Sequence, residues 1–253
     1  MNFLYTLFFF VFLNAYSQNN SVLEEIKGNP KEYKETWYEA KKTKTGFLKG
    51  KYLHDDVYIK DSNGEFIKQS FFPTNKWDFP QNRYNDKKQK LETINYYDDG
   101  GIINRTEFFY DKNKVIQEKF YYNSDTIVSS VKYEYLNDLI IKKLEFDAEK
   151  GVLSDTPNSV ITYQYDARNN MIKESHDSNF QNDVFSYVYN DKNFMTEFYS
   201  KLSFPVPDKE SKLSMRFEYK KYDLHNWTEI YVEDDIDSDK KSKCYFIQRE
   251  FKY

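Results

Sequence analysis

The chain has 253 residues, a formal net charge of −4 and acidic and basic residues interspersed along its length. The lack of a basic block excludes the electrostatic pattern of a nucleic-acid-binding protein. A single cysteine, Cys244, excludes an internal disulfide framework. Aromatic residues make up 19% of the chain, and Tyr, Phe, Ile and Val suit the half-buried surface of a β-sheet.

Residues 1–17 have the layout of a secretory signal peptide. An uncharged apolar run from Phe3 to Leu13 is too short to span a membrane, and the small residues Ala15 and Ser17 predict cleavage between Ser17 and Gln18. We therefore expect an exported protein located in the periplasm, at the cell surface or in the medium. No later apolar run approaches membrane-spanning length, so we expect no transmembrane segment after cleavage.

Residues 18–90 are expected to form an N-terminal portion of helix, strand and hairpin. A capping box at 21–24 predicts a short helix near 22–27. The stretch 34–40 (KETWYEA) predicts a first strand. The basic stretch 41–51 (KKTKTGFLKGK) predicts a solvated loop.

Two further signals complete this portion. The pair Asn63-Gly64 predicts a hairpin between the segments 56–60 and 65–72. Residues 73–90 lack periodicity and contain two prolines, which predicts one long loop and a boundary before the remaining residues, 91–253.

From residue 91 onward the hydrophobic pattern has a period of two, which is typical of half-buried antiparallel strands. A Tyr closes a strand about every dozen residues, and an Asp or Asn in the following turn can bond its own backbone. The repeat positions are Tyr97, Tyr110, Tyr122, Tyr135, Tyr165, Tyr189 and Tyr222. We expect an all-β fold, an elongated curved antiparallel sheet of repeated β-hairpins, with 34–72 and 244–253 as its two caps.

These turns resemble the YD repeats of the RHS family, whose unit reads roughly Y-x-Y-D-x-x-G-N followed by an apolar strand. The nearest copy is YQYDARNNMIKE (Tyr163–Glu174), in which Asn169 replaces the family's glycine; FSYVYNDKNFMTE and FEYKKYDLHNWTE are looser copies. The resemblance covers about residue 92 to the C-terminus. It implies a strand–turn–strand repeat like that of short, secreted, stand-alone bacterial YD-repeat proteins, and it implies no defined activity.

The chemistry-bearing residues form no recognisable catalytic motif. His54, His176 and His225 lie far apart without metal-ligand spacing, and no nucleophile or phosphate-binding motif occurs. We therefore expect no enzyme activity and no cofactor. Asp235, Asp237 and Asp239 begin like a calcium loop but lack its glycine and its final glutamate, so they are weak metal candidates and a solvated hairpin tip is preferred.

The tryptophans Trp37, Trp77 and Trp227, together with exposed tyrosines, form a possible sugar-stacking platform, although most aromatic residues must cover the apolar face of the sheet. Charged residues on the weaker strand faces argue against an outer-membrane strand protein. The expected function is a non-enzymatic exported scaffold that binds another protein through its sheet face or turn rows. A carbohydrate-binding module is the alternative, and a hydrolase with dispersed carboxylates is a third possibility.

Overall fold

The computed structural model describes residues 26, 28–60, 64, 66–69, 81–97, 99–123, 125–178, 181–203, 207, 210–223, 226–234 and 242–253. Within these ranges every regular element is a β-strand, and none contains a helix that is long and apolar enough to cross a membrane. The expected signal peptide lies outside the described residues. So does the expected helix near 22–27, except for Ile26, which is not helical.

Antiparallel pairing organises the chain as an all-β meander, as predicted. The strand β10 pairs only with β9, over two residues, and the other sixteen strands form one sheet. The strands are β1 (Glu32–Thr43), β2 (Gly46–Lys60), β3 (Phe66–Gln69), β4 (Gln81–Tyr84), β5 (Lys90–Tyr96), β6 (Ile102–Asp111), β7 (Lys114–Tyr122), β8 (Thr126–Leu136), β9 (Leu139–Glu149), β10 (Val152–Leu153), β11 (Ser159–Tyr165), β12 (Met171–Ser178), β13 (Val184–Tyr189), β14 (Met195–Lys201), β15 (Lys212–Tyr222), β16 (Trp227–Asp234) and β17 (Lys243–Lys252).

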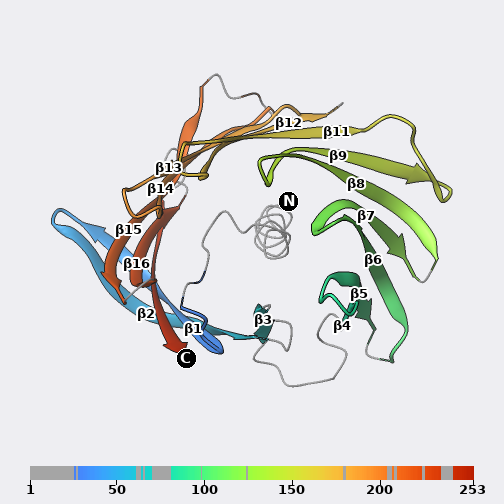
Figure 1. Cartoon of the computed structure of the whole chain (residues 1–253). Helices are drawn as coiled ribbons and strands as arrows, with labels where there is room; N and C mark the ends of the chain where they lie inside the picture. The colour runs from blue at the N-terminus through green and yellow to red at the C-terminus, as the bar shows by residue number, and fades with distance from the viewer. Residues whose placement is uncertain are drawn as a thin grey trace.

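The two ends of the described chain pair with each other. Strand β17 lies antiparallel to β1, from Glu32 opposite Lys252 to Glu39 opposite Tyr245. The sheet therefore curls into a ring, which Figure 1 shows end-on. Among the described residues β3 pairs with β2 and β4 pairs with β5, and no register joins β3 to β4, so strand pairing leaves the ring open between them. The segments expected to cap separate ends of an open sheet thus meet in one seam.

Two expected loops contain strands. Within the expected loop 73–90, residues Gln81–Tyr84 form β4 and pair with β5, so the hairpin series begins earlier than residue 91. The expected basic loop 41–51 is the tip of the β1–β2 hairpin, with its turn between Thr43 and Gly46. The sequence did not predict β4 or the paired tip of the β1–β2 hairpin, because their exposed polar side chains lack the alternation of apolar and polar residues that marks a half-buried strand.

The position of the β1–β2 hairpin identifies which face of the sheet points out of the ring. Its tip lies outside the ring in Figure 1, where Phe47 stacks on Tyr231 with ring centroids 5.0 Å apart. Tyr231 therefore points outward and its neighbours Ile230 and Val232 point inward. Residues directly opposite each other on neighbouring strands share a face, so the pairings carry this assignment around the ring.

The two faces differ in chemistry. The concave face is largely aromatic and aliphatic, and includes Phe108, Val131, Tyr133, Ile161, Tyr163, Tyr187, Phe217, Ile230, Val232 and Ile247. The convex face carries many charged residues, among them Lys132, Glu134, Lys142, Glu197, Arg216, Glu218, Glu229 and Glu233, interspersed with aromatic and aliphatic residues such as Phe109, Leu144, Phe146 and Tyr231. Burial of the concave apolar face supplies the main driving force for folding the sheet.

Tyrosine hydroxyls on the concave face join consecutive hairpins. Each donates to a backbone carbonyl 20 to 25 residues earlier, at the start of the second strand of the preceding hairpin. The four bonds are Tyr110 to Lys90 (2.8 Å), Tyr135 to Val115 (2.7 Å), Tyr165 to Ile140 (2.8 Å) and Tyr219 to Met195 (2.7 Å). We call these bonds the tyrosine clamps. The clamped unit is a two-strand hairpin, twice the repeat length read from the sequence.

Burial keeps the clamp hydroxyls protonated. It raises the pKa of Tyr135 and of Tyr165 to about 12, and nearby Glu118 and Glu174 act in the same direction. Both phenols therefore remain hydrogen-bond donors to a higher pH than an exposed tyrosine does.

Removing a clamp should destabilise the protein. Tyr135→Phe deletes the donor to the Val115 carbonyl, and we expect it to lower the free energy of unfolding by about 1 kcal/mol. Tyr189→Phe is the matched control, because the buried Tyr189 hydroxyl has no hydrogen-bond partner among the described residues. That change should be neutral or slightly stabilising. Urea unfolding of both variants tests the clamp, and equal losses of stability would contradict it.

Candidate functional site

Hairpin turns gather along one end of the strands. They comprise residues 85–89, 112–113, 137–138, 166–170 and 190–194, which we call the turn rim. Figure 1 shows the β6–β7 and β8–β9 turns nearer the centre of the ring than the opposite ends of the same strands. The clamped carbonyls lie at the starts of the strands that leave these turns. The tyrosine clamps therefore fix each rim turn relative to the turn of the preceding hairpin.

The rim turns after Tyr165 and Tyr189 are shaped by the Asp or Asn that follows the Tyr. The Asp166 Oδ1 accepts the backbone N–H of Arg168 (2.8 Å) and of Asn170 (2.9 Å). Asn190 makes the same pair of bonds to the backbone two and four residues on, at 2.9 and 3.0 Å. In both turns the intervening asparagine, Asn169 or Asn193, adopts a left-handed φ of 64° or 65°. This is the turn chemistry expected from the sequence.

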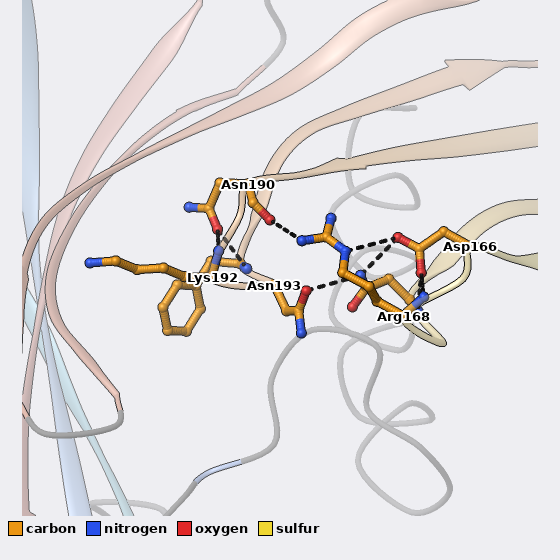
Figure 2. A network of polar contacts seen from close by, with 7 residues as sticks. Asp166, Arg168, Asn190, Lys192 and Asn193 are labelled. Carbon is orange, nitrogen blue, oxygen red and sulfur yellow. Dashed lines mark hydrogen bonds and ion pairs between the residues drawn. The ribbon is translucent and has the colours of Figure 1, made fainter.

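Neighbouring turns are bonded to each other, and Figure 2 shows one such junction. The Arg168 guanidinium donates to the Asn190 carbonyl (3.1 Å), and the Asn170 amide donates to Asn193 Oδ1 (3.3 Å). Further along, the Lys192 ammonium lies 4.0 Å from the Tyr222 ring centroid.

Similar junctions continue around the rim. Gln89 donates to the Lys112 carbonyl at 2.6 Å, and Lys114 forms a 2.6 Å ion pair with Asp138. The turn rim is therefore a row of exposed polar residues whose backbones are fixed by side-chain bonds within and between turns.

The acids of the rim titrate low. Partial burial would raise the pKa of Asp166, but the hydrogen bonds from Asn170 and from the backbone N–H of Arg168 outweigh it and lower that pKa. The hydrogen bond and charge of Lys114 lower the pKa of the exposed Asp138. Both carboxylates are charged at neutral pH.

Asp166 should make the stability of its turn pH-dependent. Because its pKa is lower in the folded than in the unfolded protein, its contribution is present above about pH 4 and is lost as the pH falls through the folded-state pKa. Asp166→Asn keeps the Oδ1 acceptor but cannot titrate, so it should reduce the loss of stability at acidic pH. Asn190→Asp is the converse change and should make the protein lose more stability at acidic pH. Melting temperatures measured from pH 6 to pH 2 test both changes. The same dependence on pH in the parent protein and in both variants would contradict the assignment.

Two buried carboxylates lie on the concave face. Tyr133 donates to Glu118 at 2.8 Å, and Tyr187 donates to Glu174 at 3.1 Å. Glu174, only 1% exposed, also contacts His176 Nε2. Burial, reinforced by the carboxylates, raises the pKa of Tyr133 and of Tyr187. These acids sit in hydrogen-bonded pairs with phenols, an arrangement that stabilises the sheet. Within the described ranges no three His, Cys, Asp or Glu side chains gather as a metal site.

The seam between β1 and β17 brings two of the sequence-predicted tryptophans into one cluster. Trp37, half-buried, stacks on His54 with centroids 5.6 Å apart and packs against the apolar core that contains Trp227. Trp227 is 4% exposed, and the Arg249 guanidinium lies 3.7 Å from its ring centroid. Its ring face is therefore covered, and of these two only Trp37 keeps some exposure. Trp77 lies outside the described residues.

Apart from Tyr189, whose buried hydroxyl has no hydrogen-bond partner among the described residues, and Tyr222, the repeat tyrosines fall into two groups that the sequence does not separate. Tyr110, Tyr135 and Tyr165 make clamps. Tyr97 and Tyr122 lie at the opposite end of the strands, 46% and 52% exposed, where their mutual hydrogen bond raises the pKa of Tyr97. The tyrosines of the two groups have similar local sequences. Only the direction of the strand decides which end of the sheet each tyrosine reaches.

The last repeat position was displaced by an irregularity in the strand. Tyr222 precedes the Asp of its turn and is 37% exposed, whereas Tyr219 makes the clamp. Register shifts on either side of Lys221 separate the two tyrosines, and no sequence signal marks them. Of the remaining sequence-predicted residues, Asp235, Asp237, Asp239 and His225 lie outside the described residues.

Comparisons with known proteins bear on the fold alone. No protein-family model matches the chain, and neither does any curated protein sequence. Among solved structures, one similar fold is a porin-like protein from Bacteroides uniformis. It has a TM-score of 0.54 and 8% sequence identity, and the match covers 89% of this chain and 98% of that one. The curled antiparallel sheet is thus an arrangement also found in a solved protein.

Proposed function

We propose that this chain is an exported, non-enzymatic scaffold that binds another protein through its turn rim. The observation that supports the proposal is the fixed geometry of exposed charges in neighbouring turns, such as Arg168 bonded to the Asn190 carbonyl. A surface that is ordered before binding loses less conformational entropy on association. Its mixture of charges favours specificity for a complementary protein surface.

A lipid-embedded role is less well supported, although the structural neighbour is described as porin-like. A strand face in contact with lipid carries a continuous apolar band. The convex face instead carries ion pairs such as Lys142 with Glu134 (3.3 Å) and Arg216 with Glu197 (3.5 Å). We therefore propose that this face meets water. We also propose that the hairpins are YD-type repeats, on the strength of their turn sequences.

Affinity capture tests the scaffold proposal. Residues 18–253 serve as bait for the envelope and secreted proteins of the source cell, and we expect one stoichiometric partner. Lys87→Glu/Lys112→Glu, which reverses two exposed charges on the turn rim, should abolish its capture. Lys173→Glu makes the same change on the convex face and should leave capture intact. A folded bait without a partner, or capture that resists the rim change, would refute the proposal.

Carbohydrate binding is the second candidate function, favoured by the exposed Tyr97 and Tyr122. Adjacent aromatic rings at a rim offer flat faces on which sugars stack. A polysaccharide ligand should then change tyrosine fluorescence in the parent protein and not in Tyr97→Ala/Tyr122→Ala. An unchanged spectrum across a broad polysaccharide panel would count against this function.

A further inference from the structure

The strand β2 has a long unpaired edge. Its inner edge pairs with β1 from Gly46 to Ile59, whereas β3 covers its outer edge only from Val57 to Lys60. Among the described strands, none has a pairing register with the outer edge of residues 46–55. The backbone N–H and C=O groups on such an edge are a template for a further strand.

The hairpin that carries this edge is held in place by contacts with the convex face. Lys42 forms a 2.7 Å ion pair with the buried Glu233, and Lys49 donates to Gln248 at 2.6 Å. Together with the stacking of Phe47 on Tyr231, these contacts anchor the tip outside the ring (Figure 1).

The hairpin bends toward this anchorage at two register shifts, between Trp37 and Ala40. At Gly50 an added Cβ would lie 3.0 Å from the Glu39 carbonyl oxygen, so a glycine permits the close approach of the two strands there. The edge is therefore presented in a fixed, extended conformation.

Toward the tip of the hairpin the surface around the edge is basic and partly apolar, and the acidic Asp55 at the far end of the segment forms an ion pair with Lys34 (2.7 Å). Leu48 is 61% exposed and Tyr52 is 50% exposed. Lys41, Lys44 and Lys51 are also exposed, and no described acidic residue forms an ion pair with them. This combination fits a partner with acidic and apolar side chains.

We propose that the outer edge of residues 47–55 takes up an extended acidic segment of a partner protein as an added antiparallel strand. The inference rests on the proposed protein-binding function and assigns it a second contact. Open backbone groups select a peptide over a glycan or a lipid, because pairing needs main-chain donors and acceptors. A second copy of this edge is disfavoured, since it would bring two rows of lysines together.

Lys49 and Lys51, the lysines of β2 along this edge, have a structural role as well, because lysine on an edge strand deters unwanted pairing. An acidic segment would neutralise that deterrent, whereas a neutral or basic segment would not. Charge thus acts as the selective element and backbone pairing as the source of affinity.

A synthetic peptide tests the edge directly on residues 18–253. The probe is a blocked peptide of about eight residues that alternates glutamate and valine. One control replaces each glutamate by lysine, and another carries N-methyl groups on alternate backbone amides. Fluorescence anisotropy measures affinity, and hydrogen exchange with mass spectrometry locates the bound peptide.

We expect the acidic peptide to bind and to slow exchange in residues 46–56 alone. The N-methylated and lysine peptides should not bind. Lys41→Glu/Lys51→Glu should lower the affinity for the acidic peptide at least about tenfold, equivalent to ~1.4 kcal/mol. The doubly substituted protein should bind the lysine peptide instead. Lys173→Glu should leave the affinity unchanged.

Three results would overturn the assignment: no binding up to ~1 mM peptide, equal binding of the N-methylated peptide, or protection elsewhere in the chain. Slow exchange of residues 46–56 in the free protein, with a dimer in sedimentation, would assign the edge to a second copy. If the peptide fails while capture through the turn rim succeeds, only the edge assignment falls and the scaffold proposal stands.

Discussion

The pairing of β1 with β17 is the constraint on which the rest of the molecule depends. It joins residues that lie more than two hundred positions apart, from Glu32 opposite Lys252 onward. The entropic cost of closing a loop grows only slowly with its length, so eight antiparallel residue pairs can offset it. Without this seam both strands would expose a long edge, and the core around Trp227, Ile230 and Ile247 would lose the cover of Trp37.

The curvature of the sheet also gives its two faces different chemistry. Tyrosines and carboxylates that point inward satisfy each other, as in Tyr133 with Glu118, or bond to the backbone of the next hairpin, as in the clamps. Charges that point outward form ion pairs in water, where each contributes little to stability. Polar groups that are exposed and yet conformationally fixed lie at the turn rim and on the β1–β2 hairpin.

Local patterns predicted much of this architecture. The period of two identified the strands from β5 onward, and the Asp or Asn after each Tyr identified turns such as Asp166 and Asn190, because both signals act within a few residues. Closure was not predictable, since nothing in Glu32–Glu39 marks its partner in Tyr245–Lys252. The same limit applies to the candidate sites. Trp37 and Trp227 meet only through the seam, and Tyr97 differs from Tyr110 only in the end of the sheet that it reaches.

Native-state hydrogen exchange along the β1–β17 seam tests this account most directly. If the seam holds β1–β3 on the sheet, the paired amides of β1 and β17 should exchange only through global unfolding, with the same protection as the central β8–β9 hairpin. Exchange of β17 as fast as that of an exposed edge, such as residues 46–56 of β2, would show that the seam opens independently. That result would contradict the claim that the chain's two ends hold the fold together.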